Sequence, residues 1–372
     1  MDNRKVVVVL FGGRSGEHEV SIRSASSVIR EADKAKYRIV PILISKEGRW
    51  TNPAESLRAL SIEAVGSLGD DAHLLPDSVF RLGPEAGLRS IVASDGAVPI
   101  PIDVIFPLIH GTYGEDGTIQ GLFDLADVPY VGCGVLASAN GMDKVFMKRL
   151  FSEAGLPICR YRWLTRGEWE SDCEKVISRI EELGYPCFVK PANLGSSVGV
   201  SRANDRRELI AAIEFAATFD AKVIIEECLE MREIECAVLG NDDAKASLLG
   251  EYVVKDNSKR FLDYTEKYGA TGNNEFVVPA AVDEEVSSEI RKMAIAAFKS
   301  IDGSGIARVD FFLLDDGRVY VNEINTMPGL TDASGYPKMW AASGIPISAL
   351  IDALIELGVE RHTERSRNKT SR

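Results

Sequence analysis

The hydrophobic run at residues 6–11, Val-Val-Val-Val-Leu-Phe, limits the fold more than any other feature of the chain. A strand with apolar side chains on both faces has to be covered on both sides, which is typical of parallel sheets in α/β proteins. The run ends at Gly12-Gly13, a helical pattern follows at about 21–31, and a second apolar strand is expected at 38–44. Strand, helix and strand in close succession predict a βαβ unit, and hence an α/β fold that begins with a parallel sheet.

The rest of the chain continues this alternation of strands and helices. Buried strands are expected at 104–109, 187–190 and 222–226, and helices at 118–126, 142–154, 206–217, 284–300 and 347–357. Residues 60–100 are weakly patterned and predict a peripheral insertion. Residues 256–274 form a long polar segment without periodicity. Irregular segments of this length inside a compact protein are commonly functional lids.

The charge of the chain argues against several classes of partner. Asp and Glu total 56 against 43 Lys and Arg, which gives a net charge of −13. An acidic body repels phosphate backbones and anionic lipids, so neither nucleic acid nor a membrane is expected as a partner. No apolar run approaches the ~20 residues that span a bilayer. Residues 361–372 carry five basic side chains and one acid, and we expect them to be a disordered tail.

The cysteines and histidines indicate neither zinc nor disulfides. The chain has six cysteines without a C-x-x-C pair, and only four histidines. Zinc sites are built from these two residue types at characteristic spacings, so a zinc site is not expected. Scattered, reduced cysteines are typical of a cytoplasmic protein.

The segment 307–325 is the most informative for chemistry. Two apolar-rich strands flank Asp316-Gly317, which predicts a β-hairpin with a two-residue type I′ turn. This turn places Asp310 opposite Glu323 and Arg308 opposite Asn325, with all four side chains on one face. The other face is expected to be buried and carries Val309, Phe311, Leu313, Tyr320 and Ile324.

The opposed carboxylates of this hairpin favour the binding of a cation between them. Directly opposed residues have Cβ atoms ~5 Å apart, where like charges are destabilising. Oxygen ligands from Asp310, Glu323 and Asn325 suit Mg²⁺ or Mn²⁺. The alternative is a solvated charged face on which Arg308 neutralises one acid, and a bulge in either strand would shift the pairing. Gly329 follows Pro328 in the next turn, where its N–H can point into the same site.

The sequence contains one candidate site for binding phosphate groups. The pattern G-x-x-x-x-G-K-[ST] does not occur, which excludes a P-loop NTPase. The glycines after residue 11 have the wrong spacing for a dinucleotide-binding turn. Lys190 at a strand end, followed by the small residues of 195–199, can hold phosphate oxygens, with Lys144 as a second contact. Glu226, Glu227 and Glu233 could accept hydrogen bonds from adenine and ribose.

Eight motifs in one order then identify a family. They are GGRSGEHEVS (12–21), HGTYGEDGTIQG (110–121), MDK (142–144), KPANLGSSVG (190–199), REIE (232–235), DYTEKY (263–268), ARVDF (307–311) and NEINTMPGLT (322–331). With these motifs the chain resembles the D-alanine–D-alanine ligases of the ATP-grasp superfamily, from about residue 5 to 357.

The resemblance implies a fold and a reaction. It implies an ATP-grasp architecture of three domains, at 1–135, 136–228 and 229–360, with ATP between the second and third. One D-alanine would take the γ-phosphoryl group of ATP, and the amine of a second D-alanine would displace phosphate from the acyl phosphate. Two Mg²⁺ or Mn²⁺ ions, a homodimer, a cytoplasmic location and a role in peptidoglycan precursor synthesis are implied as well.

The resemblance also assigns roles to individual residues. Substrate binding and catalysis would rest on Glu17, His110, Arg308, Gly329 and Ser334, with Ser196 and Tyr268 joining Glu17 to latch the lid. The nucleotide would be held by Lys144, Lys190, Ser196, Ser197, Glu226, Glu227, Cys228, Leu229, Glu233, Phe261, Lys267, Asn322 and Glu323. The metal ligands would be Asp310, Glu323 and Asn325, in agreement with the hairpin argument.

Some positions and alternatives stay open at this level. Cys228 stands where an aromatic residue is usual beside adenine, and Leu262 where Tyr is common, which bears on nucleotide affinity. Tyr268 favours an amine acceptor, either D-alanine or D-serine. A silent nucleotide-binding regulator would not need Arg308, and a metal-dependent hydrolase would need a base that the sequence does not reveal.

Overall fold

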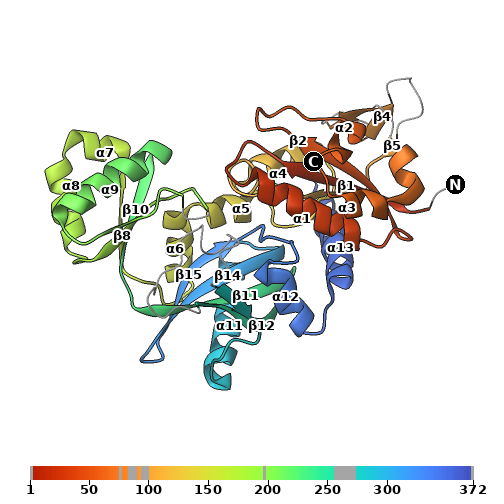
Figure 1. The fold of residues 1–372 in the computed structure, drawn as a ribbon. Helices are drawn as coiled ribbons and strands as arrows, with labels where there is room; N and C mark the ends of the chain where they lie inside the picture. The colour runs from red at the N-terminus through yellow and green to blue at the C-terminus, as the bar shows by residue number, and fades with distance from the viewer. Residues whose placement is uncertain are drawn as a thin grey trace.

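The computed structural model describes residues 3–74, 78–82, 90–93, 100–195, 198–254 and 274–369, which form three lobes (Figure 1). The N-terminal lobe is built on a parallel three-stranded sheet in the order β2–β1–β6, with bounds Tyr37–Ile44, Lys5–Gly12 and Val104–Pro107. Alternate residues of β1 pack against α1 (His18–Glu31) on one face and α4 (Thr118–Leu125) on the other. The predicted parallel α/β start is therefore confirmed.

Short elements lie at the edge of this lobe, and all but the first of them correspond to the insertion expected at 60–100. They are α2 (Pro53–Leu57), α3 (Ile62–Ser67), a 3₁₀ turn (Gly69–Leu74) and a small sheet of β3 (Ser78–Arg81), β4 (Ser90–Ala93) and β5 (Ile100–Pro101). Ala64 of α3 is buried in the core that α1 shares with the parallel sheet. Helix α3 thus packs on α1, whereas α2 packs on β2 (Figure 1).

The central lobe is an antiparallel sheet covered by helices. Its strands run in the order β7–β10–β8–β9, with bounds Tyr161–Thr165, Lys222–Glu227, Cys187–Pro191 and Ser201–Ala203. The apolar sides of α8 (Cys173–Glu181) and α9 (Arg206–Phe219) pack on one face of this sheet, next to α7 (Arg166–Ser171). The opposite face is left toward the C-terminal lobe (Figure 1).

The C-terminal lobe is a five-stranded antiparallel sheet in the order β13–β12–β11–β14–β15. The bounds of its strands are Asn274–Val277, Lys245–Val254, Met231–Gly240, Gly305–Leu314 and Val319–Asn325. Helix α11 (Glu284–Ser300) buries its apolar side on one face, and α12 (Gly335–Ala342) packs on the other. Helix α13 (Ile347–Arg365) crosses to the N-terminal lobe, where it contacts α1 and β6.

The helix expected at 142–154 is confirmed at 144–153, and a shorter helix that was not expected precedes it. Helix α5 (Val135–Met142) ends at Asp143, whose side chain accepts hydrogen bonds from the N–H groups of the next helix, α6 (Lys144–Glu153). An aspartate in this position satisfies otherwise unpaired donors at a helix N-terminus. Met147 and Phe151 of α6 belong to the core of the C-terminal lobe, whereas Val145 packs with the central sheet. The expected domain boundary at 136 therefore falls in helices that connect the lobes, and the three-domain division remains a prediction.

The β14–β15 hairpin has the predicted register at its functional end but not the predicted turn. Leu314 pairs with Arg318 through a 2.9 Å hydrogen bond, so residues 315–317 form a three-residue loop. The register returns to the expected pairing at a bulge, where Asn322 is the additional residue of β15. Asp310 lies opposite Glu323 and Arg308 opposite Asn325, as predicted.

Because of this bulge, Tyr320 lies on the opposite face of the strand from the one predicted. Tyr320 was expected on the buried face, but it pairs with Phe312 and is only partly buried. Val319 and Val321 take the buried positions beside Phe311 and Leu313. A bulge of one residue exchanges the faces of the strand on either side of it, because side chains alternate with a period of two.

The C-terminal tail is shorter than predicted. Helix α13 continues to Arg365, so residues 361–365 of the expected tail are helical. Arg361 explains this extension, because its guanidinium donates to the carbonyls of Gly132 at 2.6 Å and Tyr130 at 3.2 Å and stacks on the Tyr130 ring. Within the described ranges, no single helix has the length and apolarity to cross a membrane, and only α12 with α13, bent by 104°, meets those criteria as a pair.

Candidate active site

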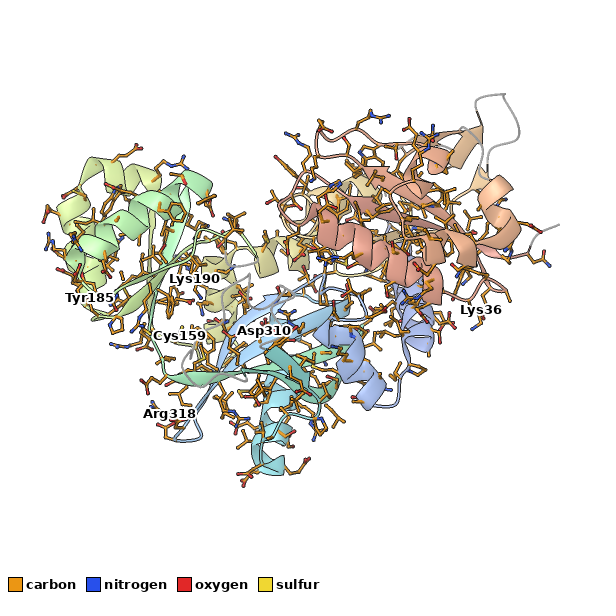
Figure 2. The ribbon with its side chains drawn as sticks, viewed as in Figure 1. Lys36, Cys159, Tyr185, Lys190, Asp310 and Arg318 are labelled. Atoms are coloured by element: carbon orange, nitrogen blue, oxygen red, sulfur yellow. The ribbon has the colours of Figure 1, made fainter. Side chains whose placement is uncertain are left out.

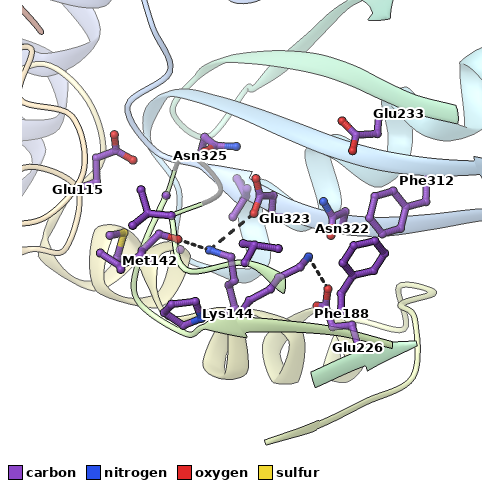
Figure 3. A pocket seen from close by; sticks show the side chains of 18 of the residues that line it. Glu115, Met142, Lys144, Phe188, Glu226, Glu233, Phe312, Asn322, Glu323 and Asn325 are labelled. Atoms are coloured by element: carbon purple, nitrogen blue, oxygen red, sulfur yellow. Dashed lines mark hydrogen bonds and ion pairs between the residues drawn. The ribbon is translucent and has the colours of Figure 1, made fainter. Parts of the chain in front are cut away.

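A pocket opens between the central and C-terminal sheets (Figure 3). It is lined by nine residues that the sequence had singled out, Lys144, Lys190, Glu226, Glu227, Leu229, Glu233, Asn322, Glu323 and Asn325. Phe188 of β8 and Phe312 of β14 approach it from the two sheets, and neither was predicted. Phe188 stands among other apolar strand residues, so no sequence signal set it apart. Phe312 lies two residues after Asp310, and alternation along the strand places it on the same face as Asp310.

One wall of the pocket carries a buried charge cluster. Lys190 of β8 donates to Oε2 of Glu226 at 2.6 Å, and Lys148 of α6 lies 2.8 Å from Oε1 of the same carboxylate. Burial would raise the pKa of Glu226, but the two ammonium groups outweigh burial and hold it far below its ordinary value. Burial would lower the pKa of Lys148, and Glu226 overcomes this effect and raises it.

The role of Glu226 toward the base remains a prediction, and its contacts in this cluster were not foreseen. Glu226 was predicted to accept hydrogen bonds from the base, but here both of its oxygens accept from lysines. Glu227 is engaged with Arg160, whose backbone N–H and Nε both donate to it at 2.7 Å. Lys148 was not predicted, although it follows Lys144 by four residues and therefore shares its helix face.

Lys144 stands at the first turn of α6, between the two walls. Its Nζ donates to the carbonyl of Leu194 at 2.7 Å and lies 3.8 Å from Oε2 of Glu323 (Figure 3). Its backbone N–H donates to the carbonyl of Ala192 at 3.0 Å, which ties the helix start to the loop after β8. Two ammonium groups, from Lys144 and Lys190, are thus brought to one pocket that also contains Glu323.

The floor of the site is a row of acids across three strands. Glu235 of β11 lies opposite Asp310 of β14, which lies opposite Glu323 of β15. Arg308 compensates this row, with hydrogen bonds to Asp310 at 2.6 and 2.7 Å and its Nε 3.5 Å from Glu235. The amide of Asn325 donates to Asp310 at 3.1 Å. Arg308 therefore neutralises one acid, as in the alternative considered for the sequence, while the opposed pair Asp310–Glu323 is present as well.

The donor chemistry of this row fits a hard divalent cation. Asp310, Glu323 and Asn325 offer only oxygen ligands on this face, the set that Mg²⁺ and Mn²⁺ prefer. Among the described residues, no three Asp, Glu, His or Cys side chains form a ready metal cage. Mg²⁺ does not require one, because it keeps several waters and takes ligands from substrate phosphates.

The N-terminal lobe contributes Glu17 and His110. Glu17 is the N-cap of α1, and Gly111 and Gly195 lie beside its carboxylate: a Cβ atom at these glycines would lie 2.8 and 3.5 Å from Oε2. His110 is buried, with Nδ1 3.1 Å from the carbonyl of Met327 and 3.6 Å from Glu115. Burial would lower the pKa of His110, but Glu115 and Glu17 outweigh it and raise the pKa.

Gly329 and Ser334 lie together at the start of α12. Ser334 is the N-cap residue of this helix, and its Oγ lies 2.7 Å from Oγ1 of Thr331. A Cβ atom on Gly329 would lie 2.8 Å from the same Oγ, so the backbone of the Pro-Gly turn closely approaches Ser334. His110 joins this turn to the N-terminal lobe through the Met327 carbonyl.

The remaining predicted residues stand as follows. Cys228 is half-buried beside the pocket, and its N–H donates to the carbonyl of Pro186 at 3.3 Å. The expected lid at 256–274 lies outside the described residues up to 273, and its last residue, Asn274, begins β13. The positions Ser196, Ser197, Phe261, Leu262, Lys267 and Tyr268 also lie outside the described residues. Their roles remain predictions.

Two family models together match nearly the whole chain. The family described as D-ala D-ala ligase N-terminus matches residues 6–133, and the one described as D-ala D-ala ligase C-terminus matches residues 150–356. The chain belongs to the D-alanine–D-alanine ligase family. It is an ATP-grasp enzyme, and this family uses ATP.

Curated members of the D-alanine–D-alanine ligase family align along the full chain. The D-alanine–D-alanine ligase of Geobacillus thermodenitrificans is 49% identical and covers 96% of each chain. That of Heliobacterium modesticaldum is 46% identical over 99% of this chain and 98% of the relative. Both alignments cover more of the chain than the segment 12–331, which contains all eight motifs.

Solved structures of this ligase family share the architecture. The D-alanine–D-alanine ligase from Coxiella burnetii has a TM-score of 0.80 at 36% identity, with 98% of each chain covered. The VanG D-Ala:D-Ser ligase from Enterococcus faecalis also has a TM-score of 0.80, at 35% identity over 96% of this chain and all of that one.

Proposed function

We propose that this chain joins two D-alanine molecules into D-alanyl-D-alanine with the hydrolysis of ATP to ADP and phosphate. The observation that carries this proposal is the pocket in which Lys144 and Lys190 on one side face Glu323 and Asn325 on the other. Phosphoryl transfer needs positive groups to position and neutralise the phosphates, and little covalent chemistry from the protein. The two lysines meet this need in a protein whose net charge of −13 would otherwise repel ATP.

Two divalent cations would be held at the acid row. Asp310, Glu323 and Asn325 are the ligands that we propose for Mg²⁺ or Mn²⁺. When bound, these ions would neutralise charge on the transferred phosphoryl group. The chain's own contribution is to keep the acids opposed across β14 and β15, with Arg308 beside them.

The D-alanines would bind where the three lobes meet. We propose that Glu17 holds the ammonium group of the first D-alanine, with His110 beside it, and that Ser334 receives the carboxylate of the second. Arg308 and the N–H of Gly329 would stabilise the acyl phosphate and the oxyanion that forms when the amine attacks. The supporting geometry is the chain of contacts that links Glu17, Gly111, His110 and the Met327–Gly329 turn.

The decisive assay measures phosphate release that depends on D-alanine. With ATP and Mg²⁺, release should require millimolar D-alanine, and mass spectrometry should find the dipeptide. ATP hydrolysis without D-alanine and without dipeptide would instead indicate a hydrolase. Nucleotide binding without turnover would indicate a regulator.

D-Serine is the second candidate acceptor. The supporting observation is the likeness to the VanG D-Ala:D-Ser ligase structure, which equals the likeness to the Coxiella burnetii ligase in TM-score. An equimolar mixture of D-alanine and D-serine separates the two by product mass. We expect the dialanine product to predominate.

We also propose a homodimer that works in the cytoplasm on peptidoglycan precursors. Helices α4 and α5 contact each other and expose a shared apolar patch, which Leu122, Leu125, Val135 and Leu136 form. A second copy with the same patch could cover it in a symmetric contact. Analytical ultracentrifugation should find a dimer that Leu136→Asp dissociates.

The six free cysteines agree with a reducing compartment, as proposed for the cytoplasmic location.

A further inference from the structure

Lys148 is a fully buried lysine that the proposed chemistry does not use. It lies on α6, and its side chain is among the largest in the described part of the chain that no solvent reaches. Its ammonium has three contacts: Oε1 of Glu226 at 2.8 Å, the carbonyl of Asn322 at 3.2 Å and Sγ of Cys159 at 3.6 Å. An ammonium has three N–H donors, so each donor has one partner.

These contacts join the two walls of the nucleotide pocket. Glu226 lies on β10 of the central sheet, whereas Asn322 is the bulge residue of β15 in the C-terminal sheet. The bulge comes directly before Glu323, a proposed metal ligand. Figure 2 shows Cys159 and Lys190 near this junction of the two lobes. A single buried group thus touches the carboxylate that holds Lys190 and the backbone that places Glu323.

The charges of Lys148, Glu226 and Lys190 indicate what the contact between Lys148 and Glu226 does. Glu226 carries one negative charge and faces two ammonium groups, from Lys148 and Lys190. The cluster therefore has one positive charge in excess. Lys190 lines the pocket and is partly accessible, whereas Lys148 is enclosed, so the excess charge is available on the side where phosphates would bind.

We infer that Lys148 is a positioning residue of the nucleotide site, which neutralises Glu226 so that Lys190 can serve a phosphate. Without Lys148, Glu226 and Lys190 would form a closed neutral pair, and an ATP phosphate would have to compete with Glu226 for the Lys190 ammonium. Lys148 also holds the Asn322 carbonyl, which keeps the bulge and Glu323 against the same wall. The inference rests on the proposed function, because it assumes a nucleotide in this pocket.

The test compares ADP binding with D-alanine use in the full chain. Lys148→Met keeps an unbranched side chain of similar length and removes its charge. We expect the Kd for ADP with Mg²⁺, measured by calorimetry, to rise at least about tenfold, as for the loss of one charge-assisted contact. The KM for ATP should rise in parallel, and the KM for D-alanine should stay unchanged.

A double variant tests the charge count itself. Lys148→Met with Glu226→Gln removes one charge of each sign, so Lys190 is again an unpaired ammonium. We expect this double variant to bind ADP more tightly than Lys148→Met alone. A purely structural role for Lys148 predicts the reverse, because two buried groups are then lost instead of one.

The matched control is Lys34→Met. Lys34 is a part-buried lysine in the N-terminal lobe, where its ammonium donates to the carbonyls of Arg30 and Ala32 at the end of α1. Its loss should lower thermal stability without changing the Kd for ADP. The comparison separates a general effect of losing a buried ammonium from an effect on the nucleotide.

The outcomes divide as follows. Unchanged ADP affinity in Lys148→Met, or an equal loss for ADP and D-alanine, would overturn the inference. If that variant does not fold, the double variant is compared with Glu226→Gln. Similar ADP affinity in the two supports the inference, because Lys148 then has no carboxylate to neutralise, whereas a further loss of about tenfold or more in the double variant would overturn it. A wild-type chain that binds ADP but makes no dipeptide would contradict the proposed function and leave the ADP comparison valid.

Discussion

Arg308 donates two hydrogen bonds to Asp310, at 2.6 and 2.7 Å, from a position two residues earlier on β14. Residues two apart on a strand point to the same face, so the guanidinium lies flat beside the carboxylate it serves. Glu323 lies opposite this carboxylate on β15. The arrangement places one cation and two acids at the end of the hairpin that faces the pocket, where charge on a phosphoryl group would develop.

The first prediction concerns Asp310. We expect Asp310→Asn to lower D-alanine-dependent phosphate release by at least about 100-fold, which corresponds to about 2.7 kcal/mol of transition-state stabilisation. An amide keeps the shape of the side chain but loses the charge that a divalent cation requires. The folded state should persist, because the apolar face of β14 packs independently in the core. Phosphate release and circular dichroism measure the two effects.

Asp316→Asn is the matched control for that substitution. Asp316 lies in the exposed loop of the same hairpin and pairs with Arg318, away from the pocket. Exposed ion pairs contribute little to stability, so this variant should keep both its rate and its fold. Near-normal turnover in Asp310→Asn would show that the metals bind elsewhere.

The second prediction concerns the divalent cation. We expect chelation by EDTA to abolish turnover, and Mg²⁺ or Mn²⁺ to restore it. Glu323→Gln should raise the Mg²⁺ concentration for half-maximal rate at least about tenfold, because one of two charged ligands is lost. Titration of the rate with Mg²⁺ at saturating ATP measures this shift. An unchanged half-maximal concentration would remove Glu323 from the ligand set.

The third prediction is a pH dependence of stability at His110. Burial opposes the charged ring, but Glu115 and Glu17 outweigh it, so the pKa of the folded state lies above the ordinary 6.5. The stabilisation that the charged His110 ring gains from Glu115 and Glu17 is therefore complete below pH 6.5. It is lost as the pH rises through the pKa of the folded state. Urea unfolding of the wild type and His110→Gln should show an advantage of the wild type that shrinks from pH 6 to pH 9. In a Glu115→Gln background the difference should depend less on pH.

The functional pairings of the hairpin were predictable from the sequence, although the turn was not. The predicted two-residue turn is a three-residue loop, and the resulting shift of one residue is cancelled by the bulge at Asn322. The alternation of apolar and polar residues defines the two sides of each strand, and this pattern favours the register that buries the apolar side. Turn length and bulges are set by backbone detail that one sequence does not reveal, which is why Tyr320 was assigned to the wrong face.

Buried charge was the other limit of the sequence. Lys148 reads as an ordinary solvated lysine on a helix, and Glu226 as a candidate ligand for the base. Their ion pair exists because α6 lies between two lobes, so the helix face that carries Lys148 meets β10 and β15. Such contacts depend on how distant segments pack. Motif order, by contrast, depends only on the chain, and it led to the correct family.

The fourth prediction uses two glycines with similar backbones and different surroundings. Gly111 and Gly69 both have positive φ, +75° and +55°, so replacement of either by alanine should cost about 1–2 kcal/mol of stability. A Cβ atom at Gly111 would lie 2.8 Å from Oε2 of Glu17, whereas one at Gly69 would meet nothing within 4 Å. Gly111→Ala should therefore displace the Glu17 carboxylate and raise the KM for D-alanine about tenfold or more, as misplaced binding groups do. Gly69→Ala should leave this KM unchanged, and equal KM values in the two variants would argue that Glu17 does not hold D-alanine.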